Sequence, residues 1–289
     1  MPIAEVNGSK VNYLQLQPES KEACDDIVMI HGLATSLAFW YLQYANELSK
    51  RYRVTLYDLK GHGRSEMPST GYSPDCLTND FEGLMDFLGI NKAHIVSHSY
   101  GGLIALKYGL RWPQRVHSLV IMDTHIALAR RAQADYVWAY GRKIQPILEK
   151  YDIDLDTADP FFGYRILTLA AKMVRKGIEL PRELSDLIGP ITGMLGKKTA
   201  NQWLKLIVTA TVEEELMLDD GLSEEALGQL KMPILPMYGE RSQAMWSAEC
   251  LERAWPDVSF EYLEAGGHFF PFTRSAEVLS RCIAFWRGL

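Results

Sequence analysis

The chain has 289 residues, of which 47% are hydrophobic and 23% are charged, as is ordinary for a soluble globular protein. Its formal net charge of −6 and the lack of a basic run argue against nucleic acid or an anionic membrane surface as a partner. The four cysteines lack C-x-x-C spacing, so we expect free thiols. The N-terminus has no signal-peptide pattern, and no apolar stretch approaches about 18 residues, so we expect a cytoplasmic chain without membrane insertion.

Short apolar segments alternate with helical segments through the first 125 residues. Alternating polarity predicts a strand at 10–17, after a turn at Asn7-Gly8, and a continuous apolar run predicts a doubly buried strand at 27–30. Further strands are expected at 53–57, 94–97 and 117–122, and helices at 38–50, 76–88 and 101–111. This alternation predicts a parallel sheet with right-handed crossovers.

The alternation stops near residue 125 and resumes more than one hundred positions later. Residues 126–226 look helical throughout, with punctuating prolines, and strands are expected again at 233–238 and 258–263, with helices at 244–254 and 274–287. We therefore expect an α/β fold: a mostly parallel central sheet flanked by helices, with a helical lid inserted after the sixth strand. The sheet domain would comprise 1–125 and 227–289, and the lid 126–226. Such a lid would cover a site at the carboxyl ends of the strands.

Ser99 is the candidate nucleophile. It lies in HIVSHSYGG (94–102), after a predicted strand and before a predicted helix, which is the setting of a nucleophile elbow. The strained turn needs small neighbours, and Gly101 and Gly102 supply them on one side. On the other side Ser97 replaces the first glycine of the G-x-S-x-G pattern, so a turn without chemistry is the alternative.

His268 is the candidate base, because a serine hydroxyl is a weak nucleophile without one. It lies in EAGGHFFP (264–271), a loop that opens on the same edge of a parallel sheet as Ser99. His125 is a possible base near the lid or a substrate contact. The remaining histidines are expected to be packed strand residues or a turn residue: His94, His98, His117 and His62.

A backbone N–H just after Gly32, in His31-Gly32-Leu33-Ala34, would face the pocket. Paired with the N–H of Tyr100, it would form an oxyanion hole, which stabilises charge on an acyl oxygen. An ordinary glycine at the end of a strand is the alternative reading of Gly32.

Five segments in this order resemble the α/β-hydrolase superfamily: HGL (31–33), YDLKGHGRS (57–65), SHSYGG (97–102), PILPMYGE (233–240) and GGHFFPF (266–272). The resemblance spans nearly the whole sheet domain. It implies that Ser99 is the nucleophile, that His268 is the base, and that the amides of Leu33 and Tyr100 hold the oxyanion. It also implies that Asp58 and Arg64 only shape their loop.

The acid that orients the base is the weak point of the resemblance. The superfamily usually has an Asp three residues after the glycine that ends the seventh strand, but here Ser242 stands at that position. Asp123, at the end of the sixth strand, is one candidate, since some members carry their acid there; as alternatives it caps a helix or lines the pocket. Glu240 is a second candidate, and a site without an acid is the third possibility.

The lid composition favours an apolar substrate. Residues 161–176 are rich in large apolar groups, and 203–208 and 245–246 add more, although plain packing would explain them too. We expect a serine hydrolase that cleaves an ester or thioester of an apolar acyl or aromatic substrate through an acyl-enzyme.

Other activities stay open. A carbon–carbon bond hydrolase or a cofactor-free oxygenase on the same fold is one alternative, and a ligand-binding protein without turnover is the other. A serine at position 99 disfavours the carboxylate-nucleophile chemistry of haloalkane dehalogenases and epoxide hydrolases. The sequence gives no sign of a metal or organic cofactor, and it leaves the natural substrate and the oligomeric state open.

Overall fold

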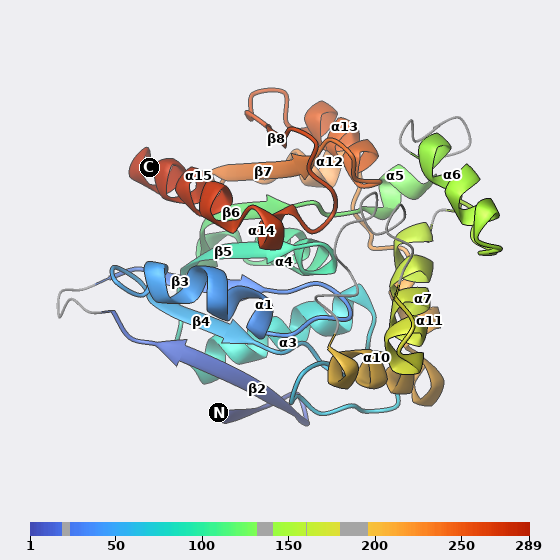
Figure 1. Cartoon of the computed structure of the whole chain (residues 1–289). Coiled ribbons are helices and arrows are strands. Elements are labelled where there is room, and N and C mark those ends of the chain that lie inside the picture. The colour runs from blue at the N-terminus through green and yellow to red at the C-terminus, as the bar shows by residue number, and fades with distance from the viewer. Residues whose placement is uncertain (19–23, 132–140, 160, 180–195) are drawn as a thin grey trace.

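The computed structural model describes residues 1–18, 24–131, 141–159, 161–179 and 196–289 (Figure 1). One sheet of eight strands has the order β1-β2-β4-β3-β5-β6-β7-β8. Its strands are β1 (Ile3–Val6), β2 (Ser9–Leu16), β3 (Asp26–Ile30), β4 (Arg53–Tyr57), β5 (Ala93–His98), β6 (Val116–Met122), β7 (Ile234–Gly239) and β8 (Glu261–Leu263). Strands β3 to β8 pair in parallel, and β1 and β2 add an antiparallel edge, so the predicted mostly parallel sheet is confirmed.

The predicted turn at Asn7-Gly8 joins β1 to β2 in a hairpin. Asn7 has a φ of 50° and Gly8 a φ of 77°, and this pair of positive values is what a tight hairpin turn requires. Strand β1 is not predicted from the sequence, because this four-residue strand buries only Ala4 and Val6. Strand β8 is shorter than predicted and begins at Glu261.

Helices cover both faces of the sheet. They are α1 (Ala38–Trp40), the π-helix η1 (Tyr41–Ala45), α2 (Asn46–Leu48), α3 (Pro74–Phe87), α4 (Tyr100–Arg111), the 3-10 helix η2 (Pro113–Arg115), α12 (Glu224–Leu227), α13 (Met245–Ala254), α14 (Phe270–Thr273) and α15 (Ser275–Arg287). Helices α3, α4 and α12 contact one another in series, while η1 contacts α15. The start of α3 follows from its sequence, because the Ser73 hydroxyl caps Cys76 N and Pro74 is the first helical residue.

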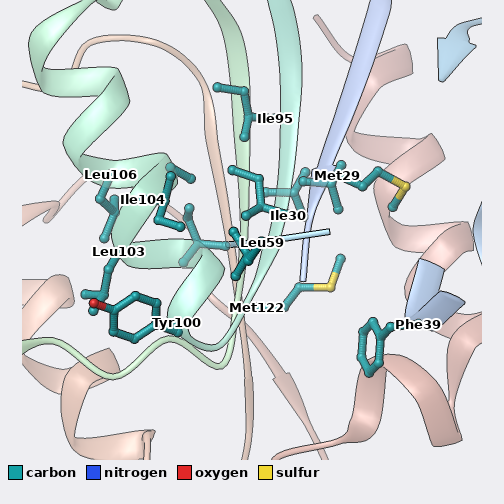
Figure 2. Close-up of a cluster of buried hydrophobic side chains, with 14 of the residues drawn as sticks. Met29, Ile30, Phe39, Leu59, Ile95, Tyr100, Leu103, Ile104, Leu106 and Met122 are labelled. Atoms are coloured by element: carbon teal, nitrogen blue, oxygen red, sulfur yellow. The ribbon is translucent and has the colours of Figure 1, made fainter. Parts of the chain in front are cut away.

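The core lies where α4 crosses the sheet (Figure 2). Helix α4 is buried continuously from Tyr100 to Gly109, so it is apolar almost all round. Figure 2 shows Leu103, Ile104 and Leu106 of this helix in one buried cluster with Ile30 of β3 and Ile95 of β5. Each such side chain contributes roughly 1.5–3 kcal/mol when it is fully buried. This packing fixes the helix that begins immediately after Ser99.

A helical insertion follows β6, as the sequence predicts. Its described helices are α5 (Ala127–Arg131), α6 (Gly141–Lys150), α7 (Phe162–Lys176), α10 (Lys197–Thr209) and α11 (Val212–Leu216). Figure 1 shows α6, α7, α10 and α11 gathered at one end of the sheet, and α7 packs against α10. The chain between Lys150 and Asp159 is not helical, which departs from the prediction. The three prolines expected to punctuate the lid, Pro160, Pro181 and Pro190, lie outside the described residues.

Two carboxylates hold the insertion in place. The buried Asp220 accepts hydrogen bonds from Ala127 N at 2.6 Å and from Leu222 N at 3.0 Å, so it joins the two ends of the insertion. Glu215 accepts hydrogen bonds from the consecutive backbone N–H groups of residues 71–73, at 2.7–3.0 Å. Partial burial opposes ionisation of Glu215, but these bonds and one from Thr211 keep its pKa below the usual range.

All four cysteines have free thiols. Within the ranges that the structure describes, no helix is both long and apolar enough to cross a bilayer.

Candidate active site

Ser99 lies in a strained turn between β5 and α4. Its φ is 56° and its ψ is −124°, a conformation that non-glycine residues rarely adopt. The turn brings backbones close together: a Cβ on Gly32 would lie 2.8 Å from the Ser99 Cβ, and one on Gly102 would lie 1.8 Å from Thr124 Oγ1. Small residues are therefore required around Ser99, as the sequence analysis argues.

Ser97 fits the position where the usual pattern has a glycine. Its side chain is fully buried, and its hydroxyl donates a hydrogen bond to the Val120 carbonyl of β6 at 3.0 Å. The extra atoms therefore point between two strands and have a partner there. This explains how the elbow forms without its first glycine.

The structure brings Ser99, His268 and Asp123 together. His268 Nε2 lies 3.0 Å from Ser99 Oγ, and His268 Nδ1 lies 2.6 Å from Asp123 Oδ2. Because a carboxylate only accepts hydrogen bonds, Nδ1 carries the imidazole proton and Nε2 is left as an acceptor for the serine hydroxyl. This is the geometry of a serine nucleophile with its base and orienting acid.

Asp123 directly follows β6 in a left-handed conformation, with a φ of 51°, and its side chain is fully buried. Gly239 N, at the end of the neighbouring β7, donates to its other oxygen, Oδ1, at 2.9 Å. Ser242, where the superfamily usually has its acid, donates its hydroxyl to Oδ2. The competing carboxylate, Glu240, instead accepts a hydrogen bond from Ala265 N at 2.9 Å and is exposed.

Two buried histidines hold the loop that contains Leu33. His31 Nε2 accepts a hydrogen bond from Leu59 N at 3.0 Å, and His62 Nε2 accepts one from Ala34 N at 3.1 Å. Burial lowers the pKa of both imidazoles to about 4, so they are neutral acceptors near pH 7. His62 was predicted to be a turn residue, but it also fixes Ala34, whose φ is 54°.

His98 supports the loop of His268. Its Nε2 donates to the His268 carbonyl at 2.9 Å, and its ring stacks on Phe39 at 4.9 Å between centroids. Burial, and then the neighbouring His268, hold the pKa of His98 well below its usual range. From the sequence, His98 is expected only to be a packed strand residue. The signal for a wider role is its place directly before Ser99.

A pocket of about 160 Å³ opens beside Ser99 and His268. Leu33 and Tyr100, the candidate oxyanion residues, both line it. The insertion supplies most of the apolar wall: Phe161, Phe162, Ile166, Leu167, Leu216 and Met217. Besides Ser99, Tyr100 and His268, the polar residues of the wall are His125, Tyr164, Arg241, Ser242 and Gln243. The insertion therefore covers the nucleophile, and the first part of the apolar segment 161–176 faces it.

Two residues of the apolar segment 203–208 lie outside the pocket wall. Trp203 packs against His62 and Tyr164, and Val208 is exposed. Asp58 accepts hydrogen bonds from three different parts of the chain, which supports a role in shaping its loop: Leu37 N, Asn12 Nδ2 and Arg64 N. In the described part of the chain, no group of three or more His, Cys, Asp or Glu side chains is arranged to hold a metal ion.

Comparison with known proteins gives one family. The family model described as alpha/beta hydrolase fold matches residues 26–163. An uncharacterized protein of Mycobacterium tuberculosis is 28% identical over 260 residues, which cover 85% of this chain and 70% of that protein.

Proteins with different activities are also similar to this chain. A 2-hydroxymuconate semialdehyde hydrolase of a Pseudomonas species is 33% identical over 131 residues, which cover 44% of this chain and 46% of that protein. The structure of naproxen esterase from Bacillus subtilis superposes with a TM-score of 0.67 at 19% identity, covering 98% of this chain and 90% of that one. At that identity the likeness shows a shared fold.

Proposed function

The chain belongs to the α/β-hydrolase superfamily, and we propose that it is a serine hydrolase that cleaves an ester or thioester through an acyl-enzyme. The observation that carries this proposal is the continuous contact from Ser99 Oγ to His268 Nε2 and from His268 Nδ1 to Asp123 Oδ2. We assign Ser99 as the nucleophile, His268 as the general base and acid, and Asp123 as the acid that orients it.

In the proposed mechanism, Ser99 Oγ attacks the acyl carbon while its proton moves to His268 Nε2. The backbone amides of Leu33 and Tyr100 hold the oxygen on which negative charge develops. The intermediate then expels the alcohol or thiol, which takes the proton from His268. A water molecule, deprotonated by the same imidazole, attacks the acyl-enzyme and releases the acid, and Ser99 regains its proton.

The apolar pocket supports a small apolar or aromatic acyl group as the substrate portion beside Ser99. Its volume of about 160 Å³ is small, since pockets that bind drug-sized ligands measure roughly 300–1,000 Å³. A dry apolar cavity of about 150 Å³ is enough for benzene. We therefore expect a phenyl group or a short alkyl chain to fit, and a long acyl chain to require displacement of the insertion.

Carbon–carbon bond hydrolysis is the second candidate. It is favoured by the 33% identity to a 2-hydroxymuconate semialdehyde hydrolase over 131 residues. Esters should therefore be compared, as substrates of the same preparation, with ketones whose hydrolysis breaks a carbon–carbon bond.

The decisive test is labelling by a fluorophosphonate probe, followed by mass spectrometry of the modified peptide. We expect the wild-type chain to be labelled at Ser99 and the Ser99→Ala variant to remain unlabelled. An unlabelled wild-type chain that binds apolar ligands tightly would favour the ligand-binding alternative and contradict the hydrolase proposal.

A series of p-nitrophenyl esters tests the pocket size. We expect kcat/KM to be highest for acyl groups of about two to six carbons or benzoyl, because these match a cavity of that volume. A steady rise in kcat/KM up to long acyl chains would contradict the proposed size limit while leaving the serine mechanism intact.

A further inference from the structure

The Asp123 carboxylate has three hydrogen-bond donors, and one is the side chain of Ser242. Gly239 N contacts Oδ1, whereas His268 Nδ1 and Ser242 Oγ both contact Oδ2. Asp123 is 0% exposed and Ser242 is 2% exposed, so water does not replace these contacts. The oxygen that orients the imidazole is therefore also held by the hydroxyl at position 242.

A second contact fixes the direction of the Ser242 hydroxyl. Ala244 N donates to Ser242 Oγ at 3.1 Å, so that oxygen already acts as an acceptor. Because an ionised carboxylate has no proton to give, the hydroxyl proton must point at Asp123. The backbone bond from Ser242 N to Gly239 O, at 2.9 Å, closes the turn after β7 and holds the side chain in place. The hydroxyl is thus an oriented donor.

We propose that Ser242 is a positioning residue, which acts through Asp123 to set how strongly the carboxylate holds the protonated His268. The donated hydrogen bond stabilises the negative charge on Oδ2 and so weakens its attraction for the imidazolium that shares this oxygen. It also prevents the carboxylate from rotating away from His268. The inference rests on the proposed function, because the roles of Asp123 and His268 belong to it.

The charged and titratable groups around His268 are Asp123 on Nδ1, His98, whose ring centroid lies 4.8 Å from that of His268, and His125 and Arg241, which line the same pocket; of these, Ser242 Oγ contacts Asp123. Removal of the Ser242 hydroxyl therefore acts on His268 through Asp123, and it should change the pH dependence of catalysis, which a loss of packing alone would not do. In Ser242→Ala the charge on Oδ2 is less dispersed, so the imidazolium is held more strongly and the base becomes available only at higher pH. We expect the midpoint of the acidic limb of the kcat/KM profile to rise by about 0.5–1 pH unit. At one pH unit below the wild-type midpoint, the ratio of the wild-type kcat/KM to that of Ser242→Ala should therefore be about three- to tenfold larger than on the alkaline plateau.

The experiment compares pH profiles of kcat/KM for a p-nitrophenyl ester. Ser242→Ala should show the shift, and Ser242→Thr, which keeps the hydroxyl, should restore the wild-type midpoint. Ser242→Cys, a close steric match with a weaker donor, should shift in the same direction by less and serves if the alanine variant does not fold. Ser118→Ala is the matched control, because Ser118 is equally buried but bonds to His94 and Trp286.

Failure of this inference can be told from failure of the proposed function. If the wild-type chain is not labelled by fluorophosphonate at Ser99, the proposed function and this inference both fall. If Ser99 is labelled but the profiles of wild type, Ser242→Ala and Ser242→Cys superimpose, only the role of Ser242 is overturned. An equal shift in Ser118→Ala would also overturn it, because the effect would then follow from any lost buried hydroxyl.

Discussion

Asp123 has no solvent contact, and both of its oxygens are committed to donors. An asparagine there would keep an acceptor for Gly239 N but would face His268 Nδ1 with an amide group, which favours the wrong tautomer of the base. In serine proteases the corresponding change lowers kcat by about ten-thousandfold. We expect a loss of similar order in Asp123→Asn, measured as kcat with an unchanged far-UV circular dichroism spectrum. A loss within about threefold would rule out the proposed role.

A carboxylate at position 242 should partly replace the one at 123. Ser242 Oγ touches the same oxygen that contacts His268 Nδ1, so an Asp side chain at 242 reaches the imidazole with little rearrangement. The amide introduced at position 123 would then donate to the new carboxylate. In Asp123→Asn/Ser242→Asp we expect kcat to exceed that of Asp123→Asn by at least about tenfold. The reason is that most of the loss of kcat in Asp123→Asn comes from the missing oriented carboxylate, which the double variant restores. Equal kcat values for the two variants would contradict this expectation.

The limits of sequence reasoning are clearest at individual residues of the site. Ser99 and His268 are marked by local patterns, a strand-to-helix turn and a glycine-rich loop. Asp123 is not, because its role depends on β6 lying beside β7, whose residues come more than one hundred positions later in the chain. His98 is hidden for the same reason: its partner is the His268 carbonyl, 170 positions away.

At the scale of elements, the insertion depends on how its two ends are held. Asp220 joins them through Ala127 N and Leu222 N, without solvent contact. In Asp220→Ala two buried N–H groups lose their acceptor, and each such loss costs about 1–3 kcal/mol. We expect the free energy of unfolding to fall by about 2–6 kcal/mol, measured by urea denaturation.

Hydrogen exchange locates the effect of Asp220→Ala. The amides of Ala127 and Leu222 should exchange faster than in the wild-type chain, while those of β5 keep their relative protection. The neighbouring exposed Asp219→Ala is the control. Its carboxylate accepts a hydrogen bond from the exposed Gly221 N at 2.8 Å, which water can replace, so the free energy of unfolding should change by less than about 0.5 kcal/mol. Comparable losses in the two variants would mean that Asp220 does not hold the insertion in this way.

The elements themselves follow closely from the sequence. Strands buried on both faces, such as β3 and the end of β6, appear as continuous apolar runs, and α3 has both a cap and a proline at its start. The hairpin strand β1 was missed because so short an edge strand buries too few side chains to form a pattern. The π-helix η1 lies within the segment 38–50, for which the sequence predicts an ordinary helix, and residue types alone do not distinguish the two.

At the scale of the whole molecule, buried neutral histidines make folding sensitive to acid. Burial lowers the pKa of His31 and His62 from the ordinary value of 6.5 to about 4, and that of His98 well below 6.5. Between about pH 6.5 and 4 the unfolded chain therefore binds protons that the folded chain does not. Stability is fully present above pH 6.5 and falls as the pH drops through this window, by about 1.4 kcal/mol per pH unit for each such histidine.

Urea denaturation between pH 7.5 and 4 tests this sensitivity. A neutral substitute such as His62→Gln, whose amide can still accept from Ala34 N and donate to Lys60 O, removes one titrating group. We expect the pH dependence of its unfolding free energy to be shallower than that of the wild-type chain by about 1.4 kcal/mol per pH unit between pH 6 and 4.5. Above pH 7.5 the difference between the two proteins should no longer change with pH. Parallel curves from pH 7.5 to 4 would show that His62 is not kept neutral by the fold.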